Sequence, residues 1–117
     1  MKESILRTKS YEFALNLVST YKNLVAEKEY VLSKQLLRSG TSIGANIREA
    51  NNAQSKADFI HKLSISLKES DETEYWLELL KDSNYIDFES FQKLQHQNRD
   101  ITRMLISSIK TLKNKKS

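Results

Sequence analysis

Residues 35–50 read QLLRSGTSIGANIREA, and two stripes of side chains run along this stretch at helical spacing. The apolar stripe, with members three or four positions apart, consists of Leu36, Gly40, Ile43 and Ile47. The polar stripe beside it consists of Gln35, Arg38, Ser42, Asn46 and Glu49. Serine, glycine and asparagine are weaker helix formers than Glu, Lys or Gln and are rarely used on a face that meets only solvent. They indicate that another helix approaches closely, with room left for it at Gly40 and Gly44.

Three further segments share this periodicity, and none alternates with the period of two that a strand requires. Helices are predicted over residues 4–27, 30–53, 55–82 and 87–113. Ser55 and Asp87 are predicted N-caps, and Asn84 is a predicted left-handed helix end. Connections this short make each helix antiparallel to the one before it. The prediction is an all-α fold, an antiparallel up-down-up-down four-helix bundle that forms one domain over residues 1–117, with a basic tail over 113–117.

The composition favours long helices and excludes several classes of protein. The chain has 117 residues, of which 38% are hydrophobic and 29% are charged, and it contains neither proline nor cysteine. The lack of proline permits uninterrupted helices, and the lack of cysteine excludes disulfides and thiolate metal sites. No apolar run exceeds three residues, so neither a membrane-spanning helix nor a secretory signal is expected. A cytoplasmic protein without membrane association is predicted.

The charges are unevenly distributed along the chain. Six acidic residues lie between Glu69 and Asp82 against Lys81 alone, whereas four lysines and no acid follow from Lys110 onward. This bipolar pattern suits pairing of unlike faces between subunits at least as well as it suits a phosphate backbone. A slender bundle with a thin core also gains from association. The lysine tail is interpreted either as a solvated terminus or as a phosphate-contacting arm. The candidate nucleic-acid contacts are Arg48, Lys56, Lys110, Lys113, Lys115 and Lys116.

A turn centred near Gln54 sets the expected register between the second and third helices. It places Arg38 level with Ser70 and within one turn of Glu69 and Glu74. We predict that Arg38 pairs with one of those two glutamates in a partly buried setting, so that Arg38→Ala costs about 3 kcal/mol. The predicted structural polar stripe is Gln35, Arg38, Ser42, Asn46, Glu49, Glu69 and Glu74. Its role is interpreted either as fixing the helix register or as forming a ligand site.

Signatures of catalysis are missing from the sequence. A di-iron bundle needs two carboxylate-x-x-His pairs, and only Asp58-x-x-His61 is present, because His96 has no carboxylate three residues before it. Neither a nucleophile elbow nor a glycine-rich phosphate loop occurs. Tyr75 and Trp76 lie among acids, which predicts core or subunit-interface packing rather than base stacking. The chain is predicted not to be an enzyme, with no catalytic residue, metal, cofactor or small-molecule substrate.

The stretch over residues 35–50 resembles the core of the bacterial four-helix-bundle family encoded in ribosomal-RNA intervening sequences. At two positions it departs from the family pattern, with Gly44 where the family often has proline and Ala50 where it often has glycine. The resemblance covers about residues 10–112. It is carried further by Ser55, Phe59, Leu63, Ser70, Glu72, Glu74, Leu77, the pair Tyr85-Ile86 and the pair Met104-Leu105.

That family is in turn similar to the accessory variability protein of diversity-generating retroelements, which forms a five-fold ring and partners nucleic acid and a reverse transcriptase. The resemblance implies a non-enzymatic, self-associating bundle, a homo-oligomeric ring of five subunits that acts as a scaffold or adaptor. The alternative is a nucleic-acid-binding accessory module that contacts RNA or DNA phosphates non-specifically through a basic surface. A protein partner is compatible with either function. The family has no established catalytic residues, so none are transferred.

Overall fold

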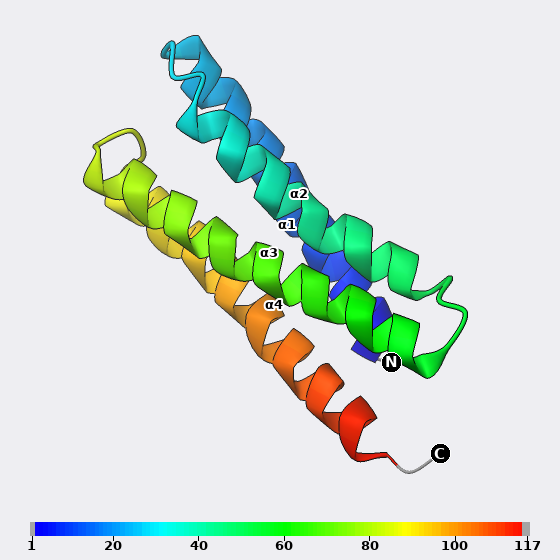
Figure 1. Ribbon diagram of the computed structural model, residues 1–117. Helices are drawn as coiled ribbons and strands as arrows, with labels where there is room; N and C mark the ends of the chain where they lie inside the picture. The colour runs from blue at the N-terminus through cyan, green and yellow to red at the C-terminus, as the bar shows by residue number, and fades with distance from the viewer. Residues whose placement is uncertain (1, 116–117) are drawn as a thin grey trace.

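The computed structural model describes residues 2–115, with side chains from residue 5 onward. Its four helices are α1 (Lys2–Ala26), α2 (Leu32–Ala50), α3 (Lys56–Asp82) and α4 (Phe88–Asn114), and the described residues form no strand. Each helix runs antiparallel to the one before it (Figure 1). The bundle measures 51 × 21 × 19 Å. The predicted all-α four-helix bundle is therefore confirmed. No described helix has the length and apolar character needed to cross a membrane.

The helices surround a core of leucine, isoleucine and phenylalanine side chains. Within the described residues α2 packs between α1 and α3, and α4 packs between α3 and α1, whereas the backbones of α1 and α3 do not approach each other closely. These two helices therefore occupy opposite corners of the bundle. The α1–α2 and α3–α4 connections lie at one end, and the α2–α3 connection and both termini lie at the other (Figure 1). We call these the loop end and the terminal end.

The predicted helix caps are confirmed. The Ser55 hydroxyl accepts a hydrogen bond from the Asp58 backbone N–H at 3.0 Å, and the Asp87 carboxylate accepts one from the Ser90 N–H at 2.7 Å. Asn84 has a φ of 65°, as expected for a left-handed helix end. The three residues on which these connections depend were thus identifiable from the sequence.

The second helix is shorter than the predicted range of 30–53. It begins at Leu32 because the buried Glu29 carboxylate accepts hydrogen bonds from the backbone N–H groups that would otherwise start the helix. It ends at Ala50 because the next N–H groups bond to carbonyls three residues back, as in Asn51 to Arg48 at 3.1 Å. The connection therefore continues as tight turns rather than as α-helix.

The two glycines of α2 permit the close approach that the sequence indicates, and the approaching helix is α1. A Cβ atom added at Gly40 would overlap the buried Leu17 side chain. At Gly44 the added atom would lie 3.2 Å from the Ser10 hydroxyl oxygen. Glycine at these positions thus permits the tight α1–α2 contact that leaves the other side of α2 to face α3.

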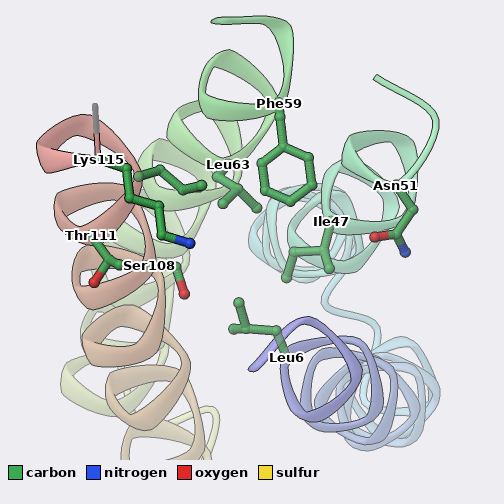
Figure 2. Close-up of a pocket in the computed structure, with 9 residues that line it drawn as sticks. Leu6, Ile47, Asn51, Phe59, Leu63, Ser108, Thr111 and Lys115 are labelled. Atoms are coloured by element: carbon green, nitrogen blue, oxygen red, sulfur yellow. The ribbon is translucent and has the colours of Figure 1, made fainter. Parts of the chain in front are cut away.

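A cavity of about 200 Å³ lies at the terminal end, where all four helices contribute to its wall (Figure 2). Its lining residues are Leu6, Ile47, Asn51, Phe59, Leu63, Ser108, Thr111, Leu112 and Lys115.

Candidate functional site

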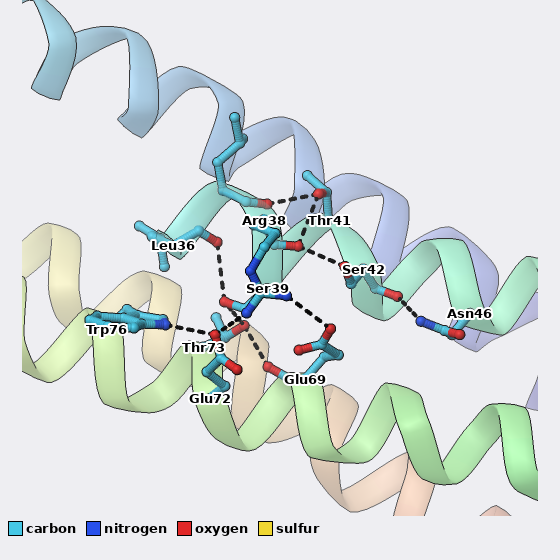
Figure 3. A network of polar contacts seen from close by, with 11 residues as sticks. Leu36, Arg38, Ser39, Thr41, Ser42, Asn46, Glu69, Glu72, Thr73 and Trp76 are labelled. Atoms are coloured by element: carbon cyan, nitrogen blue, oxygen red, sulfur yellow. Dashed lines mark hydrogen bonds and ion pairs between the residues drawn. The ribbon is translucent and has the colours of Figure 1, made fainter. Parts of the chain in front are cut away.

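The most concentrated polar cluster is the seam between α2 and α3. There the Arg38 guanidinium pairs with Glu69, at 3.3 Å between Nη1 and Oε2, and hydrogen-bonds to Glu72 (Figure 3). The indole N–H of Trp76 donates to the same Glu72 carboxylate, with 3.0 Å between Nε1 and Oε2. One carboxylate therefore joins a cation on α2 to the tryptophan of α3. We call Arg38, Glu69, Glu72 and Trp76 the seam cluster.

The structure confirms that Arg38 pairs with one of the two predicted glutamates and adds a second partner that was not predicted. Glu69 is the confirmed partner, whereas Glu74 instead pairs with Arg99 of α4 at 3.0 Å between Oε1 and Nε. The two glutamates are five positions apart, which turns Glu74 about 140° around the helix axis and away from α2. The partly buried setting predicted for this pair holds for Glu69, which is 18% exposed, but not for the Arg38 side chain, which is 50% exposed. The second partner of Arg38 is Glu72, which was not predicted.

The seam cluster keeps its central carboxylate charged. The hydrogen bond from the Trp76 indole lowers the pKa of the Glu72 carboxyl most strongly, and Arg38 lowers it further against the opposing effect of partial burial. The pKa of Glu72 is lowered because both neighbours stabilise the carboxylate anion. The cluster thus holds one guanidinium between two carboxylates.

Arg38→Ala should lower the free energy of unfolding by less than about 1 kcal/mol, because exposed ion pairs contribute little. The chain has a single tryptophan, Trp76, so its fluorescence should still respond to the lost neighbour. Denaturant unfolding monitored at this tryptophan measures both effects. A decrease of about 3 kcal/mol in the free energy of unfolding would instead support the partly buried pair predicted from the sequence.

The rest of the predicted polar stripe bonds mainly to its own helix. The Ser42 hydroxyl donates to the Arg38 carbonyl at 2.8 Å, and the Asn46 amide donates to the Ser42 carbonyl at 2.9 Å. Glu49 reaches across to Lys62 of α3 at 3.0 Å, and Gln35 is half-buried. The structure therefore joins Arg38 and Glu49 to α3 but places no side-chain bond from Ser42 or Asn46 across the seam in the described chain.

Buried hydroxyls that were not predicted from the sequence also connect α2 to α3. Thr73 Oγ1 lies 2.9 Å from Ser39 Oγ, and the Ser66 hydroxyl donates to the Ile43 carbonyl at 2.8 Å. Ser39, Ser66 and Thr73 are fully buried. These three residues lie in phase with the apolar residues of their own helices, and this spacing could have identified them as buried. These contacts fix the register between α2 and α3 from inside the bundle.

The aromatic pair of α3 divides between core and surface. Trp76 is partly buried and packs against the core, whereas Tyr75 is 57% exposed. Their rings meet edge to face with centroids 5.0 Å apart. Core packing is therefore confirmed for Trp76, and the interface packing of Tyr75 stays a prediction.

The candidate nucleic-acid contacts within the described chain lie toward the terminal end. Arg48 lies over the Tyr11 ring, with 5.4 Å between the guanidinium carbon and the ring centroid. The Lys56 ammonium donates to the Lys115 backbone carbonyl at 2.7 Å. Lys110 and Lys113 are exposed on the last turns of α4, and Lys116 lies outside the described residues. Residues 2–115 contain no group of three or more His, Asp or Glu side chains arranged to hold a metal ion.

Comparison with known proteins places this bundle in a family. The family model described as 23S rRNA-intervening sequence protein matches residues 2–107. The chain belongs to this family. A crystal structure at 1.70 Å of a protein of unknown function from the S23 ribosomal protein family of Bacteroides thetaiotaomicron VPI-5482 is 57% identical. The match covers 94% of this chain and 99% of the Bacteroides chain, with a TM-score of 0.92. No curated protein matches the chain significantly.

Proposed function

We propose that this intervening-sequence protein is a non-enzymatic scaffold or adaptor that acts as a homo-oligomer, a ring of five subunits by its resemblance to the retroelement accessory protein. The observation that carries the proposal is an exposed acidic stripe on the outer face of α3. It consists of Asp71, Tyr75, Glu78 and Asp82, which recur at helical spacing and are all exposed. A stripe of one charge sign with a tyrosine at its centre suits an opposite, partly apolar surface.

A surface of that complementary kind lies on α1. Tyr11 and Leu15, one turn apart, are 52% and 53% exposed, and the Arg48 guanidinium lies over the tyrosine ring. Because α1 and α3 occupy opposite corners, the two surfaces face different sides of the bundle. A contact between them is head-to-tail rather than two-fold, and such contacts generate rings when the rotation closes. This geometry favours a ring over a simple dimer.

Sedimentation equilibrium at micromolar concentration tests the proposal, with a mass that is a multiple of 13.6 kDa expected. The double variant Asp71→Lys/Glu78→Lys should sediment as a monomer, because it places positive charges against Arg48 on the opposing surface. The matched control is Glu27→Lys/Glu89→Lys, which changes two exposed acids elsewhere and gives the same net charge. A wild-type protein that remains a monomer of 13.6 kDa would refute the proposal.

The alternative function is non-specific binding of RNA or DNA phosphates, and one observation favours it. The hydrogen bond between Lys56 and Lys115 joins the start of α3 to the end of α4, so basic residues of both helices gather at the terminal end. The net charge of +4 per chain multiplies in an oligomer and would attract polyanions.

An electrophoretic shift with structured RNA and duplex DNA at low salt tests this alternative, and the shift should weaken steeply as salt is added. The variant Lys56→Gln/Lys110→Gln/Lys113→Gln should lose it. The control Lys22→Gln/Lys28→Gln/Lys34→Gln neutralises three exposed lysines toward the loop end and should retain it. Absence of any shift at tens of micromolar wild-type protein would leave only the scaffold function.

A further inference from the structure

The cavity at the terminal end has an apolar interior suited to a small molecule. Leu6, Ile47 and Leu63 contribute one wall each from α1, α2 and α3, and they are 1–2% exposed. Phe59 and Leu112 complete the apolar lining. The volume of about 200 Å³ exceeds the roughly 150 Å³ of an engineered apolar cavity that binds benzene. There is therefore space for a hydrocarbon body of that size and a small polar group.

One hydroxyl group in the cavity wall lacks a partner. Ser108 is 9% exposed, and its Oγ makes no hydrogen bond within the described chain. Several other helical hydroxyls donate to the carbonyl one turn back, as Thr102 does to Asn98 at 2.9 Å and Ser64 does to Ile60 at 2.8 Å. Figure 2 shows the Ser108 hydroxyl directed toward the cavity. A buried hydroxyl without a partner is unfavourable, and a ligand oxygen in the cavity would satisfy it.

The charge beside the cavity is positive. The Lys115 side chain extends over it with its ammonium toward the interior (Figure 2). The Lys56 ammonium holds the Lys115 carbonyl at 2.7 Å, which fixes this end of α4 against the start of α3. None of the residues that line the cavity is acidic. A ligand with an anionic group therefore fits this end better than a neutral or cationic one.

We propose that this cavity binds a small apolar carboxylate of about the size of hexanoate or benzoate. Its hydrocarbon part lies among Leu6, Ile47 and Leu63. Its carboxylate accepts a hydrogen bond from the Ser108 hydroxyl and pairs with the Lys115 ammonium. The proposal does not depend on self-association or on nucleic-acid binding, because it rests on the interior of a single bundle.

Isothermal titration of the full chain with hexanoate tests the proposal, and saturable binding with a dissociation constant of about 1 mM or tighter is expected. The methyl resonances of Leu6, Ile47 and Leu63 should shift along the same titration curve. Hexan-1-ol has the same hydrocarbon chain without the charge and should bind more weakly. Acetate has the charge without the hydrocarbon chain and should not bind.

The variant Ser108→Ala should produce two changes of opposite direction. Hexanoate should bind about fivefold more weakly, because one hydrogen bond is lost. The unliganded protein should unfold at a higher temperature, because the hydroxyl without a partner is gone. Ser19→Ala is the matched control, since it makes the same replacement at an exposed position of α1 and should leave hexanoate binding unchanged. Lys115→Gln should weaken hexanoate but not hexan-1-ol.

Several results would overturn the proposal. One is the absence of both heat and methyl shifts at saturating hexanoate, and another is binding of hexan-1-ol as tight as that of hexanoate. A Ser108→Ala variant with unchanged affinity for hexanoate would show that the Ser108 hydroxyl does not bind the ligand. Methyl shifts that follow protein concentration alone would mean that a second copy of the chain fills the cavity.

Discussion

Asn98→Leu should lower the free energy of unfolding by about 2 kcal/mol, because it removes a pair of buried hydrogen bonds between α3 and α4. The Asn98 side chain is 1% exposed, and it bonds twice to the same residue of the facing helix. The Ser70 hydroxyl donates to Asn98 Oδ1, and Asn98 Nδ2 donates to the Ser70 carbonyl, both at 2.9 Å. A leucine fills similar space but makes neither bond, which leaves the Ser70 hydroxyl with Thr102 Oγ1 at 2.5 Å. Because small domains are stable by only about 5–15 kcal/mol, the shift should be plain in urea or thermal unfolding.

The same helix offers a control with the opposite expected sign. Gln95 is 4% exposed, yet neither of its side-chain amide atoms has a hydrogen-bond partner in the described chain. Gln95→Leu should therefore leave stability unchanged or raise it, because a buried polar group without partners is replaced by an apolar one. The double variant Ser70→Ala/Asn98→Leu should recover part of the Asn98→Leu loss. If Asn98→Leu and Gln95→Leu change the free energy of unfolding equally, the hydrogen bonds of Asn98 do not stabilise the fold.

The features that were predictable from the sequence are those set by neighbouring residues. The apolar period of α2 follows from side chains three and four apart, and the caps at Ser55 and Asp87 bond to N–H groups three residues on. The pairing of Arg38 with Glu69 followed from a short turn that limits how α2 and α3 align. Each of these inferences needed only local geometry.

The features that were missed depend on small rotations about a helix axis. Choosing between Glu69 and Glu74 as the partner of Arg38, and recognising Glu72 as a second partner, requires knowing which side of α3 faces α2. The other side of α3 faces α4, where Arg99 pairs with Glu74. Periodicity gives the centre of a buried face but not its edges, where ion pairs form. The cavity at the terminal end could not be predicted from periodicity either, because its volume depends on how side chains from four helices pack together.

Glu29 was missed for a different reason. A glutamate just before a helix resembles a solvated loop residue, yet this one is 7% exposed. Its carboxylate accepts hydrogen bonds from the backbone N–H groups of Val31 and Leu32 at 3.0 Å each and from that of Ser33. It thus performs the role that serine, threonine or aspartate usually performs at an N-cap, from a position further upstream. Nothing in its spacing distinguishes it from the exposed Glu27.

Glu29→Ala should lower the free energy of unfolding by about 2 kcal/mol, at the upper end of the range for lost helix caps. The three N–H groups at the start of α2 would lose a charged, buried acceptor, and charge-assisted hydrogen bonds are stronger than neutral ones. Glu27→Ala, two residues earlier and exposed, should change stability by no more than about 0.5 kcal/mol. Chemical denaturation of both variants at pH 7 makes the comparison. Equal effects would mean that the α1–α2 connection does not rely on this carboxylate.

The contribution of Glu29 should also depend on pH. Burial on its own would raise the pKa of the Glu29 carboxyl, but the hydrogen bonds from Ser33, Leu32 and Val31 outweigh it and leave the pKa lowered. The unfolded chain then binds the proton more readily than the folded one, so stability rises with pH through this range. The stabilisation is complete above the unfolded pKa of about 4.3 and is lost as the pH falls through the lower folded pKa. Wild type should therefore exceed Glu29→Gln in stability at pH 7, and the difference should shrink from about pH 5 downward. Asp87 and Asp100 also have lowered pKa values but are present in both proteins, so the difference isolates Glu29. A difference that stays constant between pH 7 and pH 3, or that grows toward acid, would contradict a charged cap at this position.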